Sequence, residues 1–316
     1  MIAQIKKIIT KTPLFLPIIS MRSKQRIVKN AKNKKINVEF YKFSVDFKSQ
    51  NKIIRISNKH IIYSMDIVDS FDYYYNSVVP VDDFNGNLLV DFSNPKYHEV
   101  VGFTFQPIIF PSLAEPIVTT TQYLDFADLQ DDSVVIDLGA YSGLTSILFK
   151  QLCHKGEVIA VDADEKNMIC ILKNFQLFKT ISGLEIKLLN GAVWNHNEGL
   201  FFCNEGNMGS SAASIIGERI VESKKFINSF KLIDIANKFD LKKVDFIKCD
   251  VEGAEAVIFN DDDFFNKFRP RIIVEPHFVD GQITTVKVEN TLRKYGYKFN
   301  LIEQHGVALP LLHCYQ

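Results

Sequence analysis

The pattern of hydrophobic and polar residues changes near Ser133, and this change divides the chain into two parts. Before it, residues 36–110 hold short runs such as YKFSVDF, in which apolar and polar side chains alternate. Turn signals such as Asn85-Gly86 separate these runs, and IIRISNKHIIYSMDIV is interpreted as two strands around a turn at Asn58-Lys59. We therefore expect a small β-rich accessory subdomain over residues 1–111.

From Ser133 onward, apolar runs without alternation take turns with amphipathic helical patterns. Such runs are typical of strands that are covered on both faces. The expected strands are SVVIDL, EVIAVD, LEIKLLNGAV, KVDFIKCD and RPRIIVEP. Because strands and helices alternate, the sequence predicts a mostly parallel, doubly wound α/β sheet in a domain of residues 112–316. The last two apolar runs, YKFNLIE and VALPLLHCY, are close enough to pair as a C-terminal antiparallel hairpin.

Charge changes this picture only at the start of the chain. The 316 residues carry 37 Lys and Arg against 37 Asp and Glu, a balance that gives no general sign of nucleic-acid binding. Residues 1–35 hold no acidic residue but many basic ones, namely Lys6, Lys7, Lys11, Arg22, Lys24, Arg26, Lys29, Lys32, Lys34 and Lys35. This segment is interpreted either as a solvated, frayed terminus or as a contact with an anionic partner, such as a membrane surface or a lipid-linked phosphate.

The cysteines and the apolar segments indicate a cytoplasmic protein. The five cysteines are odd in number and widely spaced, and no C-x-x-C pair suggests zinc or redox chemistry. The patch PLFLPII is too short for a signal peptide, and no run reaches the length that spans a bilayer. We expect reduced, buried thiols in the cytoplasm, with the inner membrane surface as the alternative place of contact for the basic terminus.

The stretch VVIDLGAYSG passes from a buried strand through two glycines into an apolar helix. Ligands of open α/β sheets lie at such carboxyl ends of strands. Gly139 and Gly143 allow a sharp turn and a close approach to a ligand, and the following helix offers free N–H groups. Asp137 would repel a pyrophosphate at this turn but would attract a cation. S-adenosylmethionine, which has no phosphate and carries an ammonium and a sulfonium, fits this turn.

A second carboxylate strengthens this interpretation. Asp162 ends the next strand, nineteen positions after Gly143. A carboxylate about 20 residues beyond a glycine turn accepts hydrogen bonds from ribose hydroxyls. The simpler role for an Asp at such a position is to cap a helix, which suits Asp164.

Six segments together resemble the FkbM-type class I methyltransferases. They are VVIDLGAYSG, VIAVDADEKNMICILKN, LLNGAVW, GSSAAS, VDFIKCDVEGAEAVIF and PRIIVEPHF, in this order, within residues 123–278. The resemblance implies a Rossmann-like methyltransferase fold, S-adenosylmethionine as methyl donor, S-adenosylhomocysteine as product, and O-methylation of a sugar or another hydroxyl. The chain departs from the family at Asp162-Ala163, where Glu-Pro is frequent, and at Tyr141, where Asn is frequent.

The resemblance also implies the donor-binding residues. Those that would line the methionine part are Asp137, Gly139, Ala140, Tyr141 and Gly143. Asp162 would bind the ribose, with Ala163 beside it. Gly191, Ala192 and Val193 would border the adenine, because small residues leave room for a flat ring.

The catalytic candidates follow the fourth and fifth strands. A base that takes the proton of the acceptor hydroxyl would add to the effect of alignment. Asp250 is the first choice, His277 the second, and Glu275 lies on the same rim. Of Glu252 and Glu255, one is expected only to complement the helix dipole. These acidic residues and His277 could also converge on a divalent cation, but their spacing does not require a metal, and none is predicted.

Two motifs each allow two interpretations. FDYYY at residues 71–75 is either core or interface, or a surface that stacks on sugars. GSSAAS at residues 209–214 is either a plain loop or an acceptor loop with hydroxyl donors.

The expected function is O-methylation of a hydroxyl on a sugar, glycan or related metabolite, as in polysaccharide biosynthesis, with residues 1–111 as an acceptor-side or assembly element. A nucleic-acid methyltransferase is the nearer rival, but the chain has no N-P-P-Y-like motif. An NAD-dependent oxidoreductase disagrees with Asp137 and with the lack of G-x-G-x-x-G. A non-catalytic binding module that keeps the fold is the third alternative. The sequence does not define the acceptor or the oligomeric state.

Overall fold

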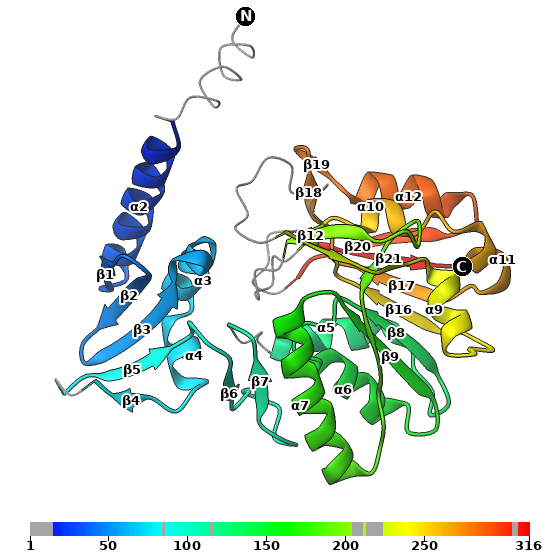
Figure 1. Cartoon of the computed structure of the whole chain (residues 1–316), viewed down its shortest axis with the longest axis horizontal. Helices are drawn as coiled ribbons and strands as arrows, with labels where there is room; N and C mark the ends of the chain where they lie inside the picture. Colours follow the sequence, from blue (N-terminus) through cyan, green and yellow to red (C-terminus); the bar gives the residue numbers. More distant parts are fainter. Residues whose placement is uncertain (1–14, 84–85, 114–116, 204–210, 213–223, 305–308) are drawn as a thin grey trace, which may run out of the picture. The chain divides into compact units, whose positions relative to one another are not determined.

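The computed structural model describes residues 15–83, 86–113, 117–203, 211–212, 224–304 and 309–316. The chain divides into two compact units, Met1–Asn94 and Pro95–Gln316 (Figure 1). Residues 95–111, which the sequence analysis placed with the front part, belong to the second unit.

The first unit combines a long helix with a five-stranded sheet. The helix α2 covers Phe15–Asn33. The sheet has the order β1-β2-β3-β5-β4, from strands Asn37–Phe40, Ser44–Ser49, Lys52–Ser57, Leu88–Asp91 and Val81–Asp82. β1, β2 and β3 are antiparallel, whereas β3 and β5 are parallel. The β-rich front part is therefore present.

The segment between β3 and β4 is helical, which corrects one prediction. A second strand was expected after Asn58-Lys59, but the chain forms η1 (Asn58–Tyr63), α3 (Ser64–Asp69) and α4 (Phe71–Asn76). The apolar residues here recur at intervals of three and four, and they are buried: Ile67, Val68, Phe71, Tyr74 and Tyr75. This period suits one face of a helix and not a strand, in which side chains alternate.

The aromatic cluster FDYYY belongs to the core of this unit. Phe71 and Tyr75 are stacked with ring centroids 6.1 Å apart, and Tyr74 meets Phe92 edge to face at 6.3 Å. Of the two interpretations of this motif, the structure supports packing.

The second unit is built on a seven-stranded sheet with the order β10-β9-β8-β16-β17-β21-β20. In this order the strands are Lys187–Asn190, Glu157–Asp162, Val134–Leu138, Phe246–Cys249, Arg271–Val274, Leu311–Tyr315 and Lys298–Ile302. The first five are parallel, and β21 is antiparallel to both of its neighbours. The predicted parallel sheet and C-terminal hairpin are confirmed. The strand order reverses between β8 and β16, where open sheets place their ligands.

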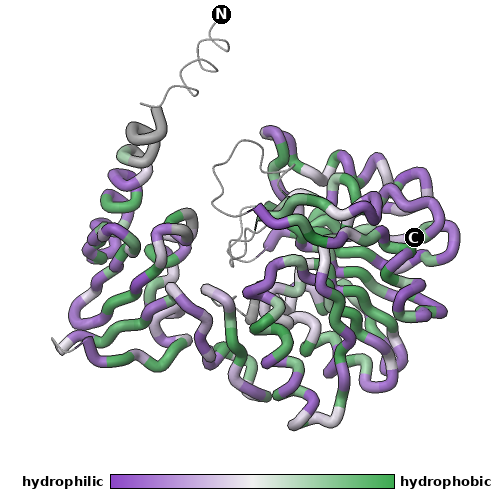
Figure 2. Tube along the Cα trace, viewed as in Figure 1, coloured by the Kyte–Doolittle hydropathy of each residue, from purple (hydrophilic) through white to green (hydrophobic). Residues whose placement is uncertain are grey.

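Helices cover both faces of this sheet. They are α5 (Ile117–Ala127), α6 (Leu144–Leu152), α7 (Glu165–Ser182), α9 (Leu232–Lys238), α10 (Glu255–Ile258), α11 (Asp262–Lys267) and α12 (Thr285–Arg293). Val135 and Phe246 pack with α5, α6 and α7, whereas the neighbouring Ile136 and Ile247 pack with α9 to α12. Successive strand residues thus pack into two separate cores, which explains why these strands are mostly apolar, with hydrophobic positions predominating along them in Figure 2.

Short strands complete the second unit. β6 (Lys96–His98) and β7 (Ile108–Phe110) form a hairpin, as do β18 (Phe278–Val279) and β19 (Gln282–Ile283). β11 (Ala192–Val193) pairs with β15 (Ser229–Phe230). β12 (Leu200–Cys203) pairs with β13 (Ser211–Ala212) and β14 (Lys224–Ile227). Only Ser211 and Ala212 of the GSSAAS motif lie within the described residues.

All five cysteines are free and buried, as predicted. Burial raises the pKa of the Cys153 and Cys170 thiols to about 11, so they remain protonated at neutral pH. Within the described ranges, no helix combines the length and the apolar character that a membrane crossing requires.

Candidate active site

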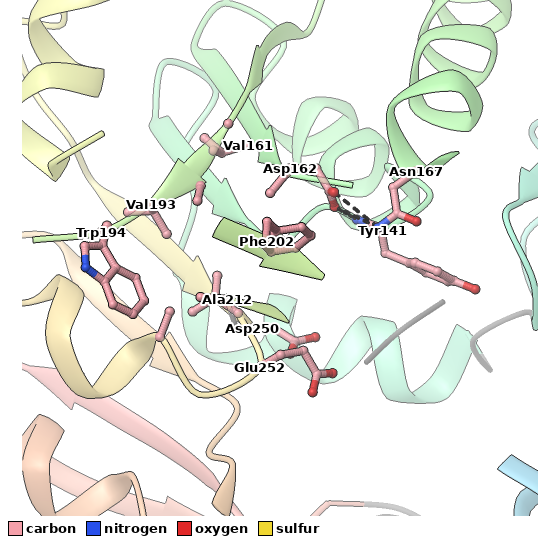
Figure 3. A pocket seen from close by; sticks show the side chains of 16 residues that line it. Tyr141, Val161, Asp162, Asn167, Val193, Trp194, Phe202, Ala212, Asp250 and Glu252 are labelled. Atoms are coloured by element: carbon pink, nitrogen blue, oxygen red, sulfur yellow. Dashed lines mark hydrogen bonds between the residues drawn. The ribbon is translucent and has the colours of Figure 1, made fainter. Parts of the chain in front are cut away.

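A pocket opens at the carboxyl ends of β8, β9 and β16, and the space between its walls, open solvent included, is about 670 Å³. It is lined by Gly139, Tyr141, Val161, Asp162, Ala163, Asn167, Gly191, Ala192, Val193, Trp194, Phe202, Ala212, Asp250, Val251, Glu252 and Ala254. Figure 3 shows Asp162, Asn167 and Tyr141 grouped on one side, Val193 and Trp194 on another, and Asp250 and Glu252 on a third. The sequence had placed eight of these residues in the site.

The turn after β8 lies directly against the turn after β16. Gly139 has φ 76°, and a Cβ at this position would lie 1.7 Å from the carbonyl oxygen of Asp250. Only glycine fits such an approach without moving the backbone. The Lys248 Nζ atom donates a hydrogen bond to the Gly139 carbonyl at 2.7 Å, so the two turns are also joined by a side chain.

Two pocket residues other than glycine have left-handed backbones. Tyr141 has φ 52° and Glu252 has φ 53°. Such conformations cost on the order of 1 kcal/mol or more and gather at functional sites. Tyr141 is held there because its N–H donates to Asp162 and its hydroxyl donates to the Leu113 carbonyl, both at 2.8 Å.

Asp162 is buried at the end of β9 and organises the turn. Its oxygens accept hydrogen bonds from the backbone N–H groups of Tyr141 and Asp164, and from the Asn167 amide at 3.2 and 3.3 Å. Burial raises the pKa of Asp162 to about 7, although the two backbone hydrogen bonds oppose this shift. The neighbouring Asp164 caps α7 as expected, by accepting from the N–H groups of Lys166 and Asn167.

Asn167 is a pocket residue that sequence reasoning missed. It lies in the first turn of α7, its side chain is nearly buried, and its Oδ1 atom has no hydrogen-bond partner among the described residues. A buried acceptor without a donor is costly, so a ligand that donates here would be favoured. Its place five residues after Asp162, at the start of a helix, was a usable signal.

Asp137 does not line the pocket. It is fully buried, accepts a hydrogen bond from the Ser146 hydroxyl and lies 3.5 Å from the Lys248 Nζ atom. Burial raises the pKa of Asp137, while the charge of Lys248 opposes that shift. Within the protein, Asp137 interacts with Ser146 and Lys248.

Ala140 and Gly143 are likewise absent from the lining. Gly143 precedes α6 with φ 81°, and a Cβ there would meet the Phe175 ring at 2.6 Å. A glycine is needed at position 143 because a larger residue would collide with Phe175 of α7. Of the residues assigned to the methionine part, the pocket includes Gly139 and Tyr141.

The acidic rim brings the catalytic candidates together. The His277 Nε2 atom lies 3.7 Å from Asp250 Oδ1 and 3.6 Å from Glu252 Oε1. Asp250 and Glu252 line the pocket, whereas His277 and Glu275 do not. Glu275 instead accepts a hydrogen bond from the Tyr123 hydroxyl.

The electrostatics of the rim favour a proton on His277. Burial alone would lower the pKa of His277, but the hydrogen bond to Glu255 and the charges of Glu252 and Asp250 outweigh it and raise the pKa to about 10. Burial raises the pKa of Glu252 to about 8 against the opposing charge of His277. A protonated imidazole donates and does not accept, so His277 fits the role of base less well than Asp250.

Glu255 has the structural role that was expected of one of the two glutamates. It is fully buried at the start of α10. Its carboxylate accepts hydrogen bonds from the Gly253 N–H at 2.8 Å and from the Thr284 hydroxyl at 2.9 Å. Glu252 is the glutamate that reaches the pocket.

The model of the FkbM methyltransferase domain matches residues 137–299. No curated protein matches the sequence. Among solved structures, the chain is similar to precorrin-6y C5,15-methyltransferase from Geobacter metallireducens GS-15, with 16% identity, 62% of this chain and 84% of that chain covered, and a TM-score of 0.39.

Two further structures have comparable similarity. One is a SAM-dependent methyltransferase from Aquifex aeolicus, with 13% identity, 62% and 87% of the two chains covered, and a TM-score of 0.35. The other is the human methyltransferase 10 domain containing protein, with 13% identity, 64% and 83% covered, and a TM-score of 0.40.

The family model spans more than half of the residues of this chain. The chain therefore belongs to the FkbM methyltransferases and is an enzyme that uses S-adenosylmethionine as its methyl donor.

Proposed function

We propose that this enzyme methylates a hydroxyl oxygen of a sugar, a glycan or a related metabolite. The observation that carries the proposal is the pair of carboxylates, Asp250 and Glu252, at one side of the donor pocket. A hydroxyl group is a neutral hydrogen-bond donor, so it can approach these carboxylates closely. A phosphate-rich nucleic acid would be repelled by them.

The chemistry of the lining fits the donor. Among the described residues that line the pocket, none is basic, which suits a cationic ligand and disfavours a pyrophosphate. Asp162 and Asn167 offer acceptors for the ribose hydroxyls, and Gly191, Ala192 and Val193 border the adenine. Trp194 and Phe202 add apolar surface for a flat ring.

The remaining task of the protein is alignment. S-adenosylmethionine supplies a methyl group on a sulfonium, which is a good leaving group. Asp250 lies at the end of β16 with its side chain about one fifth exposed to the pocket, where it can accept a hydrogen bond from the acceptor hydroxyl and orient its oxygen. Its negative charge also favours loss of the hydroxyl proton during transfer.

The donor assignment is tested with Asp162→Ala. Loss of the carboxylate should weaken S-adenosylmethionine binding by about 1–3 kcal/mol in calorimetry. Glu157→Ala removes a carboxylate at the other end of the same strand, where Glu157 pairs with Lys187, and should leave the affinity unchanged. Unchanged affinity in the Asp162 variant would contradict the assignment.

The acceptor side is tested with Asp250→Asn. This isosteric change should lower kcat by about 10² or more on a sugar acceptor while donor binding persists. If His277→Ala lowers kcat more, with the acceptor KM unchanged, His277 is the base. If both variants keep nearly full turnover, catalysis rests on alignment alone. A chain that binds donor but methylates no hydroxyl acceptor would be a binding module.

A further inference from the structure

Three potential metal ligands converge on the acceptor side of the pocket. One side-chain atom from each of Asp250, Glu252 and His277 lies within 4.8 Å of the others. Asp250 and Glu252 come from the turn after β16, and His277 follows the neighbouring strand β17. The carboxyl ends of two adjacent parallel strands therefore bring two oxygens and one imidazole nitrogen together.

The imidazole of His277 is held in one orientation by a buried carboxylate. Its Nδ1 atom is 3.0 Å from Glu255 Oε1, and that oxygen also accepts hydrogen bonds from the His277 N–H and the Thr284 hydroxyl. Nε2 is thereby directed toward Asp250 and Glu252. A carboxylate behind the second nitrogen is the usual support of a metal-binding histidine, because it fixes the ring and makes it a stronger ligand.

The ligand distances suit a small divalent ion. Bonds of about 2.1 Å in a tetrahedral site place ligand atoms about 3.4 Å apart. Nε2 lies 3.6 Å and 3.7 Å from the two carboxylate oxygens, so small side-chain movements would complete the set. Two oxygens and one nitrogen suit Mn²⁺ or Zn²⁺ better than Mg²⁺, which prefers oxygen alone.

Acidic side chains also outnumber basic ones around this cluster. Four carboxylates gather here, those of Asp250, Glu252, Glu255 and Glu275, which interact electrostatically with one another. Lys248 and a protonated His277 bring two positive charges, and Lys248 is shared with Asp137. A divalent cation in place of the imidazole proton would add one positive charge to this acidic group.

We propose that Asp250, Glu252 and His277 bind a divalent transition-metal ion whose open positions face the pocket and take the acceptor hydroxyl. The inference rests on the proposed O-methylation and deepens it. The acceptor O–H bond breaks and its proton passes to water, while an O–CH₃ bond forms and the S–CH₃ bond breaks to leave a neutral thioether. Asp250 then acts on the acceptor through the cation, and the favoured acceptor is one with two adjacent oxygens that can bind together.

The first experiment measures Mn²⁺ binding to the full-length chain after treatment with a chelator. Electron paramagnetic resonance should show that one Mn²⁺ per chain leaves the free, hydrated pool, and Zn²⁺ should compete. His277→Ala, Asp250→Asn and Glu252→Gln should each weaken binding about tenfold or more. Glu252→Gln alters a residue that lies at the pocket surface, so it serves as the variant least disturbing to the fold. Circular dichroism checks that each variant is folded.

His154→Ala is the matched control. His154 pairs with Asp131 at 3.2 Å, but both side chains are exposed, and among the described residues they belong to no group of three potential metal ligands. Its loss should leave Mn²⁺ binding unchanged. If the wild-type chain binds neither Mn²⁺ nor Zn²⁺ at millimolar concentration, or if the three pocket variants bind as the wild type does, the cluster is an ion pair and the proposal is wrong.

Failure of the cation site and failure of the proposed function give different results. Methylation of a sugar hydroxyl that persists after chelation would overturn the cation site and leave the O-methyltransferase intact. Site-specific Mn²⁺ binding without any hydroxyl methylation would support the cation site and contradict the proposed acceptor. If both are right, chelation should abolish methylation, added Mn²⁺ should restore it, and donor affinity should not change.

Discussion

The carboxylate of Asp162 serves both the folding of the pocket and the binding of the donor. It accepts hydrogen bonds from the Tyr141 N–H in the turn after β8, and from the Asp164 N–H and the Asn167 amide, which follow β9. Its burial raises its pKa to about 7, so the carboxyl group of the free enzyme titrates near neutral pH. Ribose hydroxyls donate hydrogen bonds, and they are bound more strongly by the ionised form.

Donor affinity should therefore depend on pH. Below pH 7 the proton on Asp162 must leave before the donor binds, so affinity should fall as pH decreases, approaching tenfold per unit below about pH 6. Above about pH 8 the affinity should be constant with respect to this group. Calorimetry between pH 5.5 and 8.5 measures the profile, and Asp162→Asn should remove the slope. A flat profile for the wild type would contradict the assignment of Asp162 to the ribose.

Among single residues, the sequence correctly predicted pocket residues whose position depends only on where a strand ends. Asp162 and Asp250 end parallel strands and reach the pocket, as predicted. Asp137 also lies near a strand end, but its register partner on β16 is Lys248, more than 100 residues away in the chain. Strand register between distant segments cannot be read from one sequence. The internal pairing of Asp137 was for this reason not foreseen.

At the scale of elements, the pocket depends on contact between two turns. Gly139 packs against the Asp250 carbonyl, and a Cβ there would overlap it. Gly139→Ala should lower the free energy of unfolding by more than the approximately 1 kcal/mol expected for a positive φ alone, and should abolish donor binding. Gly183→Ala is the control, since Gly183 has φ 75° with nothing near its Cβ position. Equal losses in chemical denaturation would show that the close approach is unimportant.

The helices and strands could be predicted from the sequence where a clear hydrophobic pattern extended over many residues. The five parallel strands and the C-terminal hairpin follow from repeated apolar runs. The stretch after Asn58 was misread because β-branched residues within it suggested strands, whereas burial follows a helical spacing from Ile67 to Tyr75. Tertiary packing outweighed local strand propensity there.

At the scale of the whole molecule, one buried side chain helps to attach the hairpin β6–β7 to the second unit. Asn174 of α7 donates to the carbonyls of Ile109 and Ser142, at 2.9 and 2.8 Å, and accepts from the Ile109 N–H at 2.9 Å. The hairpin β6–β7 is thereby fixed to the methyltransferase unit and to its glycine turn. Ile109 and Asn174 are 65 positions apart in the sequence, and a polar contact between such distant residues leaves no trace in the hydrophobic pattern. The sequence analysis therefore placed the end of the front part at residue 111.

This boundary sets the last prediction, which concerns the role of the first unit. A chain that begins at Pro95 keeps β6, β7 and the Asn174 contacts, so it should fold and bind S-adenosylmethionine with an affinity close to that of the full chain. A chain that begins at Ser112 lacks the buried Ile108 and Phe110 and leaves Asn174 without its partners on β7, so it should be markedly less stable in thermal unfolding.

If the first unit serves the acceptor or the assembly, the Pro95 chain should lose methylation of the natural acceptor while donor binding persists. Full methylation by the Pro95 chain would show instead that the second unit alone holds everything the reaction needs.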